Sequence, residues 1–215
     1  LNKPIFTSVL LGLLFSSTLL AQDNSPYSRY GIGDLTPITN INNRGMGGIT
    51  AGYTDPLSIN FSNPASFSSF PAWKEKKTKK LSSGRSILDM GINIDNRTLR
   101  DASSSSGFTA SNAVFSYLQV GMPLRKNWGM SFGLRPVSRI SYKVDKSERL
   151  RDPRTGLPID SSLTRYKGDG GAYLASLGTG LALYSREKNG LEEKLSIGFN
   201  VGYLFGKKDY SSRRS

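Results

Sequence analysis

From residue 86 onward the chain alternates apolar residues with small or polar ones in five runs, and this period of two constrains its fold more than any other feature. Alternate side chains of a strand point to opposite faces, so each run predicts a long β-strand with one apolar face. The apolar positions of the five runs are Leu88, Met90, Ile92 and Ile94; Val114, Leu118, Val120, Met122 and Leu124; Trp128, Met130, Phe132, Leu134, Ile140 and Tyr142; Tyr173, Ala175, Leu177, Leu181 and Leu183; and Leu195, Ile197, Phe199, Val201, Tyr203 and Phe205. The pattern predicts an all-β chain.

The connections between these runs alternate in length. Residues 125–127 (RKN) and 185–190 (SREKNG) have the composition of tight turns, whereas residues 96–111 and 144–168 are predicted to be long loops. Tight turns at one end of a sheet and long loops at the other are typical of outer-membrane β-barrels. The second long loop is basic, with Lys143, Lys146, Arg149, Arg151, Arg154, Arg165 and Lys167 against Asp145, Glu148, Asp152 and Asp160.

Two environments explain strands of this kind: a soluble β-sandwich and a transmembrane barrel. The residues opposite the apolar ones are mainly Gly, Ser, Asn and Ala, which suit a crowded, curved interior. Each run also has about the 9–11 residues that a tilted strand needs to cross a bilayer. We therefore expect a transmembrane antiparallel β-barrel in the bacterial outer membrane. Five strands do not close a barrel, for which about eight is the usual minimum, so the chain is predicted to be a fragment.

The N-terminal part predicts two further units. Residues 1–21 resemble a secretory signal peptide, with Lys3, an apolar centre over residues 9–15 and Ala21 before the cleavage point. Residues 22–84 are predicted to form a hatch, or plug, with a basic linker that includes residues 74–80, ahead of the barrel strands in residues 85–215. The hatch is rich in Gly, Asn, Pro and Ser, but its apolar residues argue that it packs inside something: Tyr27, Tyr30, Ile32, Leu35, Met46, Tyr53, Phe61, Phe67 and Phe70.

Composition argues against catalysis. The chain has no Cys and no His, which removes thiolate and imidazole metal sites and any triad that uses His as its base. We therefore expect no enzyme activity, no cofactor and no metal site. Lys and Arg number 29 against 16 Asp and Glu, for a net charge of +13, but an exported chain rarely meets nucleic acid. The basic run is read as a solvated linker, and the basic loop as a surface that pairs with phosphates of outer-membrane lipid and lipopolysaccharide.

Three motifs of the N-terminal part carry a family resemblance. They are residues 24–35 (NSPYSRYGIGDL), residues 44–48 (RGMGG) and the tripeptide Asn63, Pro64 and Ala65 ahead of the first long strand. With these motifs the chain resembles the FadL/TodX-type long-chain fatty-acid transporter family of outer membranes, in a form typical of Bacteroidetes. The resemblance covers residues 22–215 and corresponds to the N-terminal half of that family.

The resemblance implies a barrel of about fourteen strands plugged by the hatch, and passive uptake of hydrophobic compounds such as long-chain fatty acids or aromatic hydrocarbons. It implies a ligand and hatch site at Asn63, Pro64, Ala65, Tyr27, Tyr30, Phe61 and Phe67, and a lateral opening at Pro136. The plainer reading of these residues is that Pro64 and Asn63 fix a turn, that the aromatics fasten hatch to wall, and that Pro136 lies at the rim of the bilayer. Two other functions stay open: a non-transporting barrel of the same type that works with secretion-apparatus proteins, and a secreted β-sandwich adhesin.

Overall fold

The computed structural model describes residues 25–74, 81–100, 107–188 and 191–215. The predicted signal peptide and the basic run from residue 75 to residue 80 lie outside the described residues. The elements are, in chain order, η1 (Pro26–Arg29), β1 (Asp34–Leu35), α2 (Ile41–Gly45), η2 (Pro64–Ser69), β2 (Ala72–Lys74), β3 (Leu81–Gly84), β4 (Ile87–Leu99), β5 (Phe108–Arg125), β6 (Trp128–Arg151), β7 (Pro158–Lys188) and β8 (Leu191–Arg214). The predicted all-β class is confirmed.

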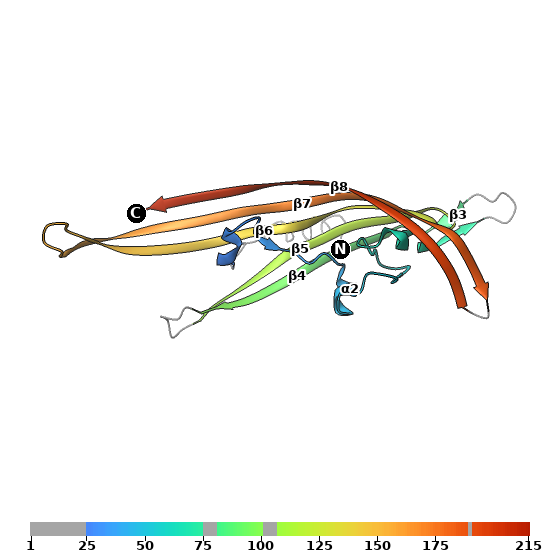
Figure 1. Cartoon of the computed structure of the whole chain (residues 1–215), viewed down its shortest axis with the longest axis horizontal. Coiled ribbons are helices and arrows are strands. Elements are labelled where there is room, and N and C mark those ends of the chain that lie inside the picture. Colours follow the sequence, from blue (N-terminus) through green and yellow to red (C-terminus); the bar gives the residue numbers. More distant parts are fainter. Residues whose placement is uncertain (1–24, 75–80, 101–106, 189–190) are drawn as a thin grey trace, which may run out of the picture.

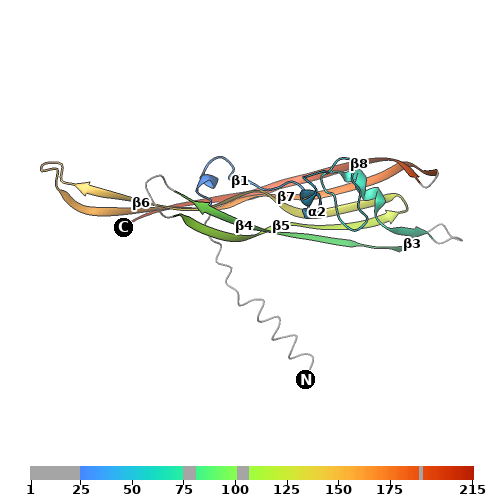
Figure 2. The same cartoon turned by 90° about the horizontal axis from the view of Figure 1, so that it is seen from below.

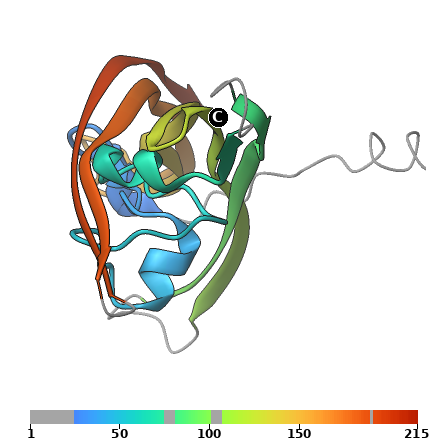
Figure 3. The same ribbon diagram turned by 90° about the vertical axis from the view of Figure 1, so that its right-hand side faces the viewer.

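The five long strands form one antiparallel sheet in the order β4-β5-β6-β7-β8, to which the short strand β1 is added on β6. β2 and β3 form a separate two-stranded hairpin. The sheet curls around residues 25–71, here called the N-terminal segment, which lies on its concave face (Figure 3). Among the described residues β4 and β8 do not pair with each other, so the sheet is open. It forms one curved layer rather than the two layers of a sandwich.

The tight turn predicted at residues 125–127 is confirmed, and Asn127 supports it with a left-handed φ of 66°. The long loop predicted at residues 96–111 is shortened at both ends, because Asn96 to Leu99 pair with Phe108 to Ser111, and residues 101–106 lie outside the described residues. The long loop predicted at residues 144–168 is wrong. β6 and β7 stay paired from Lys143 and Lys167 out to Arg151 and Pro158, so that residues 152–157 alone connect them. This ladder forms the long extension at one end of the sheet (Figure 1). Most side chains of the extension are polar on both faces, and Val144, Leu150 and Leu163 are scattered among them. The sequence therefore carries no sustained apolar period there, although the backbone is paired.

Irregular pairing changes which face of the sheet some side chains occupy. The register of β6 and β7 shifts between Pro136 and Ser138, and beyond that point Ile140 and Tyr142 are buried on the concave face. The prediction that they share a face with Trp128 is therefore wrong. A second shift, between β4 and β5 at Gly91, turns Val114 toward the concave side as the partner of Asn93. An extra residue in one strand reverses the alternation beyond it.

The hydrophobic core lies between the N-terminal segment and the concave face. It consists of Ile59, Phe61, Phe67, Phe70, Ile87 and Tyr117. The rings of Phe67 and Phe70 stack with centroids 5.5 Å apart, and Phe61 packs on Tyr117 at 5.2 Å. At Gly129, Gly180 and Gly198, a β-carbon would collide with the backbone of residues 64–68, so these glycines let η2 lie directly on the sheet.

The opposite, convex face carries a continuous set of exposed apolar side chains that we call the convex belt. Its members are Leu88, Met90, Ile92, Ile94, Phe115, Leu118, Phe132, Tyr173, Leu177, Leu181, Leu183, Leu195, Ile197, Phe199, Val201, Tyr203 and Phe205. Isolated exposed apolar residues are common on soluble proteins, but a patch of this extent marks a surface that contacts a membrane or another protein.

The β6–β7 extension holds an ion pair with a testable pH dependence. Asp145 accepts hydrogen bonds from Nε of Arg165 at 2.8 Å and from its Nη2 at 3.0 Å, which hold the pKa of Asp145 below its ordinary 3.8. An acid with a lowered folded-state pKa stabilises the fold above its unfolded pKa, and this contribution is lost as the pH falls through the folded value. We expect the extension to weaken only below about pH 4.

Carboxyl NMR titration tests this expectation. The pKa of Asp145 should lie below 3.8 in the wild type and return toward that value in Arg165→Gln. Arg149→Gln, which removes a cation of the same extension that has no ion-pair partner among the described residues, should leave it unchanged. A wild-type pKa at or above the ordinary value would contradict the pairing.

Candidate functional site

The most irregular part of the sheet is a split between β5 and β6. The two strands pair only from Leu118 and Leu134 to Arg125 and Trp128. Beyond this ladder β5 continues as far back as Phe108 beside β4 alone, while β6 continues beside β7. Figure 1 shows the two pairs of strands diverging from this point.

The N-terminal segment takes the place of β5 along the freed edge of β6. Asp34 and Leu35 of β1 pair with Arg139 and Ser138. The amide of Thr36 donates to the carbonyl of Val137 at 3.0 Å, and its hydroxyl donates to the carbonyl of Pro136 at 2.7 Å. The edge of β6 next to the split is therefore hydrogen-bonded by this segment, as a buried edge requires. Figure 2 shows β1 lying along the sheet at this position.

Further along the same edge, η1 continues the pairing. The amide of Ser25 donates to the carbonyl of Ser141 at 3.2 Å, and the amide of Ser141 donates to Oγ of Ser28 at 3.0 Å. Both serines of the N-terminal segment are buried. The replacement for β5 thus extends from Pro136 to Ser141.

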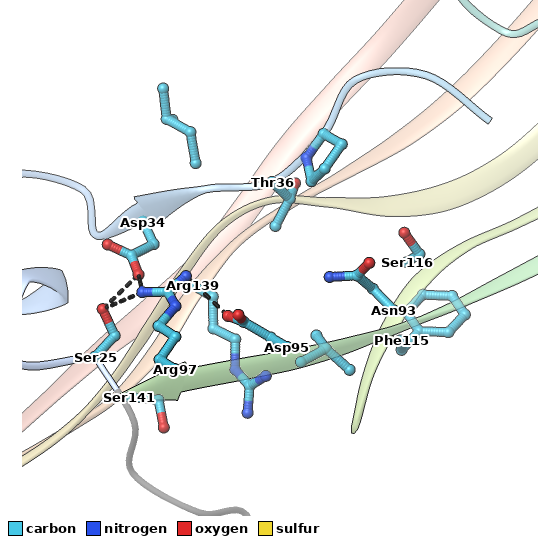
Figure 4. A pocket seen from close by; sticks show the side chains of 13 residues that line it. Ser25, Asp34, Thr36, Asn93, Asp95, Arg97, Phe115, Ser116, Arg139 and Ser141 are labelled. Carbon is cyan, nitrogen blue, oxygen red and sulfur yellow. Dashed lines mark hydrogen bonds and ion pairs between the residues drawn. The ribbon is translucent and has the colours of Figure 1, made fainter. Parts of the chain in front are cut away.

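Arg97 of β4 connects the other side of the split to this segment. Its Nη1 contacts Oδ2 of Asp34 at 2.7 Å and donates to Oγ of Ser25 at 2.9 Å, and its Nη2 contacts Oδ2 of Asp95 at 2.8 Å. The hydroxyl of Ser25 in turn donates to Asp34. Figure 4 shows this Arg97 cluster with Arg139 beside it, in a cavity of about 240 Å³ that lies between β1, β4, β5 and β6.

A second polar network fastens α2 and the following residues to the concave face. The Tyr117 hydroxyl donates to Oδ1 of Asp89 at 3.0 Å and accepts from the amide of Ile41 at 3.2 Å. Oδ2 of Asp89 accepts from the amide of Ile59 at 3.0 Å. Arg44 of α2 donates to Oδ1 of Asn93 at 3.1 Å. These hydrogen bonds between part-buried groups attach α2 and Ile59 to β4 and β5.

A third group of contacts joins η2 to β8. Nζ of Lys194 donates to Oγ of Ser69 at 2.6 Å and to the carbonyl of Ser68 at 3.3 Å. Nδ2 of Asn200 donates to the carbonyl of Phe61 at 3.1 Å. The N-terminal segment is therefore hydrogen-bonded to β4, β5, β6 and β8, and η2 packs directly on β7 at Gly180.

The residues predicted as a ligand and hatch site separate into two groups. Asn63 precedes η2, Pro64 begins it, and Ala65 follows, where the backbone lies against Gly180 and Gly198. Phe61 and Phe67 lie in the core, with Phe67 only 1% exposed. Tyr27 and Tyr30 lie elsewhere and are 74% and 71% exposed. These residues do not line one common cavity.

Pro136, the predicted lateral opening, lies at the register shift of β6 just beyond the last β5–β6 pair. Proline has no N–H to give to a ladder, which suits an irregular position of this kind. Its carbonyl is bonded to Thr36, so the split next to it is occupied by the N-terminal segment.

Sequence reasoning missed the Arg97 cluster. Its signal was present: continuing the period of the first run past Ile94 puts Asp95 and Arg97 on the polar face, two residues apart. Their partner Asp34 lies 63 residues earlier, in a stretch without any period, so no local pattern connects them.

Removing the Arg97 guanidinium should loosen the segment locally. In Arg97→Met, Asp34 and Asp95 lose their shared cation, whose pairs contribute about 1 kcal/mol or less at this exposure. We expect faster hydrogen exchange at the amides of Ser25 and Thr36, with unchanged exchange in the β7–β8 ladder. Arg100→Met, directly after the end of β4 and without a side-chain hydrogen bond or ion pair to the described residues, is the control. Equal exchange in both variants would contradict the role of Arg97.

The described residues contain neither a long apolar helix nor a cluster of carboxylates that could hold a metal ion. No helix among them is long and apolar enough to cross a membrane. Within the same residues, no three Asp or Glu side chains come close enough together to hold a metal ion. The contacts described above have one feature in common, an N-terminal segment that completes the interrupted edge of a curved sheet.

An all-β chain with an open, curved antiparallel sheet and a broad apolar convex face is matched by the family model of BamG over residues 3–215. The chain belongs to the BamG family, whose name is tied to the BAM outer-membrane assembly machinery, and is an outer-membrane-associated protein. Comparison with curated proteins gave no match, and comparison with solved structures gave none either.

The family match corrects the resemblance drawn from the sequence. The chain is not assigned to the FadL/TodX-type transporters, because the BamG model accounts for nearly its whole length. The three motifs behind that resemblance specify local backbone geometry: Gly33 and Gly47 have left-handed φ values of 93° and 76°, and Pro64 begins η2. Turn geometry of this kind is available to unrelated proteins, so it does not define a family.

Proposed function

We propose that this chain forms part of a transmembrane β-barrel in the outer membrane and acts as a subunit of the BAM outer-membrane assembly machinery. The observation that carries the proposal is the BamG family match over residues 3–215. In this proposal the curved sheet is barrel wall, and the N-terminal segment is a hatch that fills the lumen.

The dimensions of the convex belt support a membrane-spanning wall. On β7 the belt extends from Tyr173 to Leu183, and on β8 from Leu195 to Phe205. Ten residues of strand rise about 33 Å, and a tilt of about 40° reduces this to about 25 Å, the height of the apolar band of outer-membrane barrels. Tyr173 and Phe205 stack at 6.1 Å where the belt ends, in the position of an interfacial aromatic girdle.

The concave face supports a structural role for the hatch. The N-terminal segment is bonded to it by ion pairs, side-chain hydrogen bonds and a shared apolar core. Opening a passage past η2 would require breaking the backbone contacts at Gly129, Gly180 and Gly198 and exposing Phe67. A lumen filled in this way suits a subunit that offers a stable surface to partners.

Passive uptake of hydrophobic compounds stays a prediction, and no observation favours it over the assembly role. The cavity in the split contains Asp34, Asp95, Arg97 and Arg139, which suit a polar environment rather than an apolar passage. The adhesin alternative would require a soluble protein that covers the convex belt with its own chain.

Copurification tests the proposed function. The full-length protein, tagged and extracted from outer membranes in mild detergent, should migrate with the other subunits of the BAM machinery on native gels. Its depletion should slow the folding of newly made outer-membrane proteins, measured by the appearance of their heat-modifiable forms. A protein that migrates alone, with folding rates unchanged on depletion, would contradict the proposal. Uptake of labelled fatty acid that falls on depletion while folding is unaffected would favour the transport alternative.

A further inference from the structure

A second cavity, of about 660 Å³, lies at the end of the convex belt where the β5–β6 split opens. Phe115 of β5 lines it on one side of the split, and Tyr173 and Phe205 line it on the other. We call it the rim crevice. Its volume falls in the range of about 300–1,000 Å³ that is usual for small-molecule sites.

In the rim crevice, side chains of the same chemical type are aligned across neighbouring strands. Tyr173 and Phe205 are cross-strand partners and form an aromatic row. Two residues further from the belt, Arg139, Gly171 and Lys207 are aligned across β6, β7 and β8. Gly171 has no side chain, so the two cations flank an open gap about 9.6 Å wide between the backbones of β6 and β8.

Arg139 and Lys207 are both available to a ligand. The guanidinium of Arg139 has no ion-pair or hydrogen-bond partner among the described residues, and it lines both cavities. Lys207 contacts Asp209 at 2.7 Å in a solvent-exposed ion pair. Such pairs contribute little free energy, so Lys207 can leave Asp209 for a ligand at little cost. Asp169 also lines the crevice, one row further from the belt, as the cross-strand partner of Asp209.

Moving away from the belt, the crevice presents an aromatic wall, then two cations, then a carboxylate. A ligand that uses all three must be amphiphilic. A free inorganic anion would leave the aromatic wall unused, and a purely apolar compound would leave both cations unused. A lipid places its acyl chains on the convex belt and Phe115, its phosphate between Arg139 and Lys207, and a sugar hydroxyl within reach of Asp169. Cation pairs recognise phosphate through strong, charge-assisted hydrogen bonds.

The position of the crevice identifies the leaflet. It lies at the end of the sheet that carries the long β6–β7 extension, opposite the tight turn at Asn127. Long connections of outer-membrane barrels face the cell surface. The phosphate-bearing lipid of that leaflet is lipopolysaccharide.

We propose that the rim crevice binds a phosphate group of lipid A, with Arg139 and Lys207 as its ligands and with acyl chains packed against Phe115, Tyr173 and Phe205. This inference rests on the proposed placement of the convex belt in the outer membrane. In this proposal the split between β5 and β6 has two roles. It receives the N-terminal segment along the edge of β6, and it provides the crevice in which a lipid headgroup binds.

Native mass spectrometry of the full-length, detergent-solubilised protein tests the proposal. Added phosphorylated lipid A should bind in a one-to-one complex, and enzymatically dephosphorylated lipid A should bind at least tenfold more weakly. The variant Arg139→Gln/Lys207→Gln should lose at least tenfold in affinity for phosphorylated lipid A. Arg149→Gln, which removes a cation of the same extension outside the crevice, should bind as the wild type does.

Several results would overturn the site. They are equal binding of the two lipid A forms, unchanged binding in the double variant, equal binding of phosphatidylglycerol, and displacement of lipid A by millimolar inorganic phosphate. Heat-modifiable migration checks that each variant is folded. A wild-type protein that stays monomeric without detergent would refute the membrane placement, whereas a detergent-dependent protein that binds no lipid A would refute the lipid site alone.

Discussion

Replacing Leu177 by arginine should prevent the protein from reaching its folded, heat-modifiable form in the outer membrane. Leu177 lies at the middle of the convex belt, between Phe132 on β6 and Val201 on β8. An arginine on the lipid-facing side of a barrel costs about 2–4 kcal/mol at the bilayer midplane, a large part of the stability of a typical domain. The measurement is the fraction of protein that migrates as the compact species on unheated gels.

Leu157→Arg is the matched control for this experiment. Leu157 is exposed at the tip of the β6–β7 extension, outside the convex belt, so the same change of side chain should be harmless there. Equal folded fractions in Leu177→Arg and the wild type would show that water, rather than lipid, covers the convex face.

Adding one methyl group at Gly180 should displace η2 from the sheet. A β-carbon at this position would overlap the carbonyl oxygen of Pro64 and come close to the amide of Ser68, and backbone atoms cannot rotate away as a flexible side chain can. We expect Gly180→Ala to destabilise the fold by about 1–3 kcal/mol, as overpacking of a core does. The temperature at which the heat-modifiable form is lost should fall accordingly, and the amide of Phe70 should exchange faster.

Gly45→Ala provides the comparison for the same added methyl group. Gly45 lies in α2 with no atom near the position of a β-carbon, and alanine favours a helix over glycine by up to about 1 kcal/mol. This variant should be as stable as the wild type or slightly more stable. Should Gly180→Ala behave in the same way, close packing of η2 on the concave face would be disproved.

The strands themselves could be predicted because apolar residues alternate with small or polar ones along most of their length. The period of two predicts the parts of β4 to β8 that have an apolar face, but it does not predict the polar parts of the same strands. The period therefore predicts a loop from residue 144 onward, although residues 144–151 pair with β7. Backbone pairing continues past the convex belt because hydrogen bonds do not depend on which side chains face lipid or water.

The faces of the strands could be predicted only up to the first irregularity. Ile140 and Tyr142 fit the apolar period of Trp128 by counting, yet the shift at Pro136 turns them inward against the N-terminal segment. The proline indicates irregular pairing, but the face that the following side chains occupy depends on their partners in β7.

The split and its occupation by the N-terminal segment could not be predicted at all. They depend on contacts between residues far apart in the chain, such as Thr36 with Val137 and Asp34 with Arg97. The family could not be predicted from short turn motifs either, because Gly33 and Pro64 specify local backbone geometry rather than ancestry.

The central claim is that lipid contacts the convex belt while the concave face surrounds the N-terminal segment. The chain has no cysteine, so single cysteines introduced at Phe199 and Ser176 can each carry one fluorophore. In the full-length protein, reconstituted in bilayers, brominated acyl chains should quench a fluorophore at position 199 strongly and one at position 176 weakly. Strong quenching at position 176, or none at position 199 together with quenching by aqueous iodide, would contradict the claim.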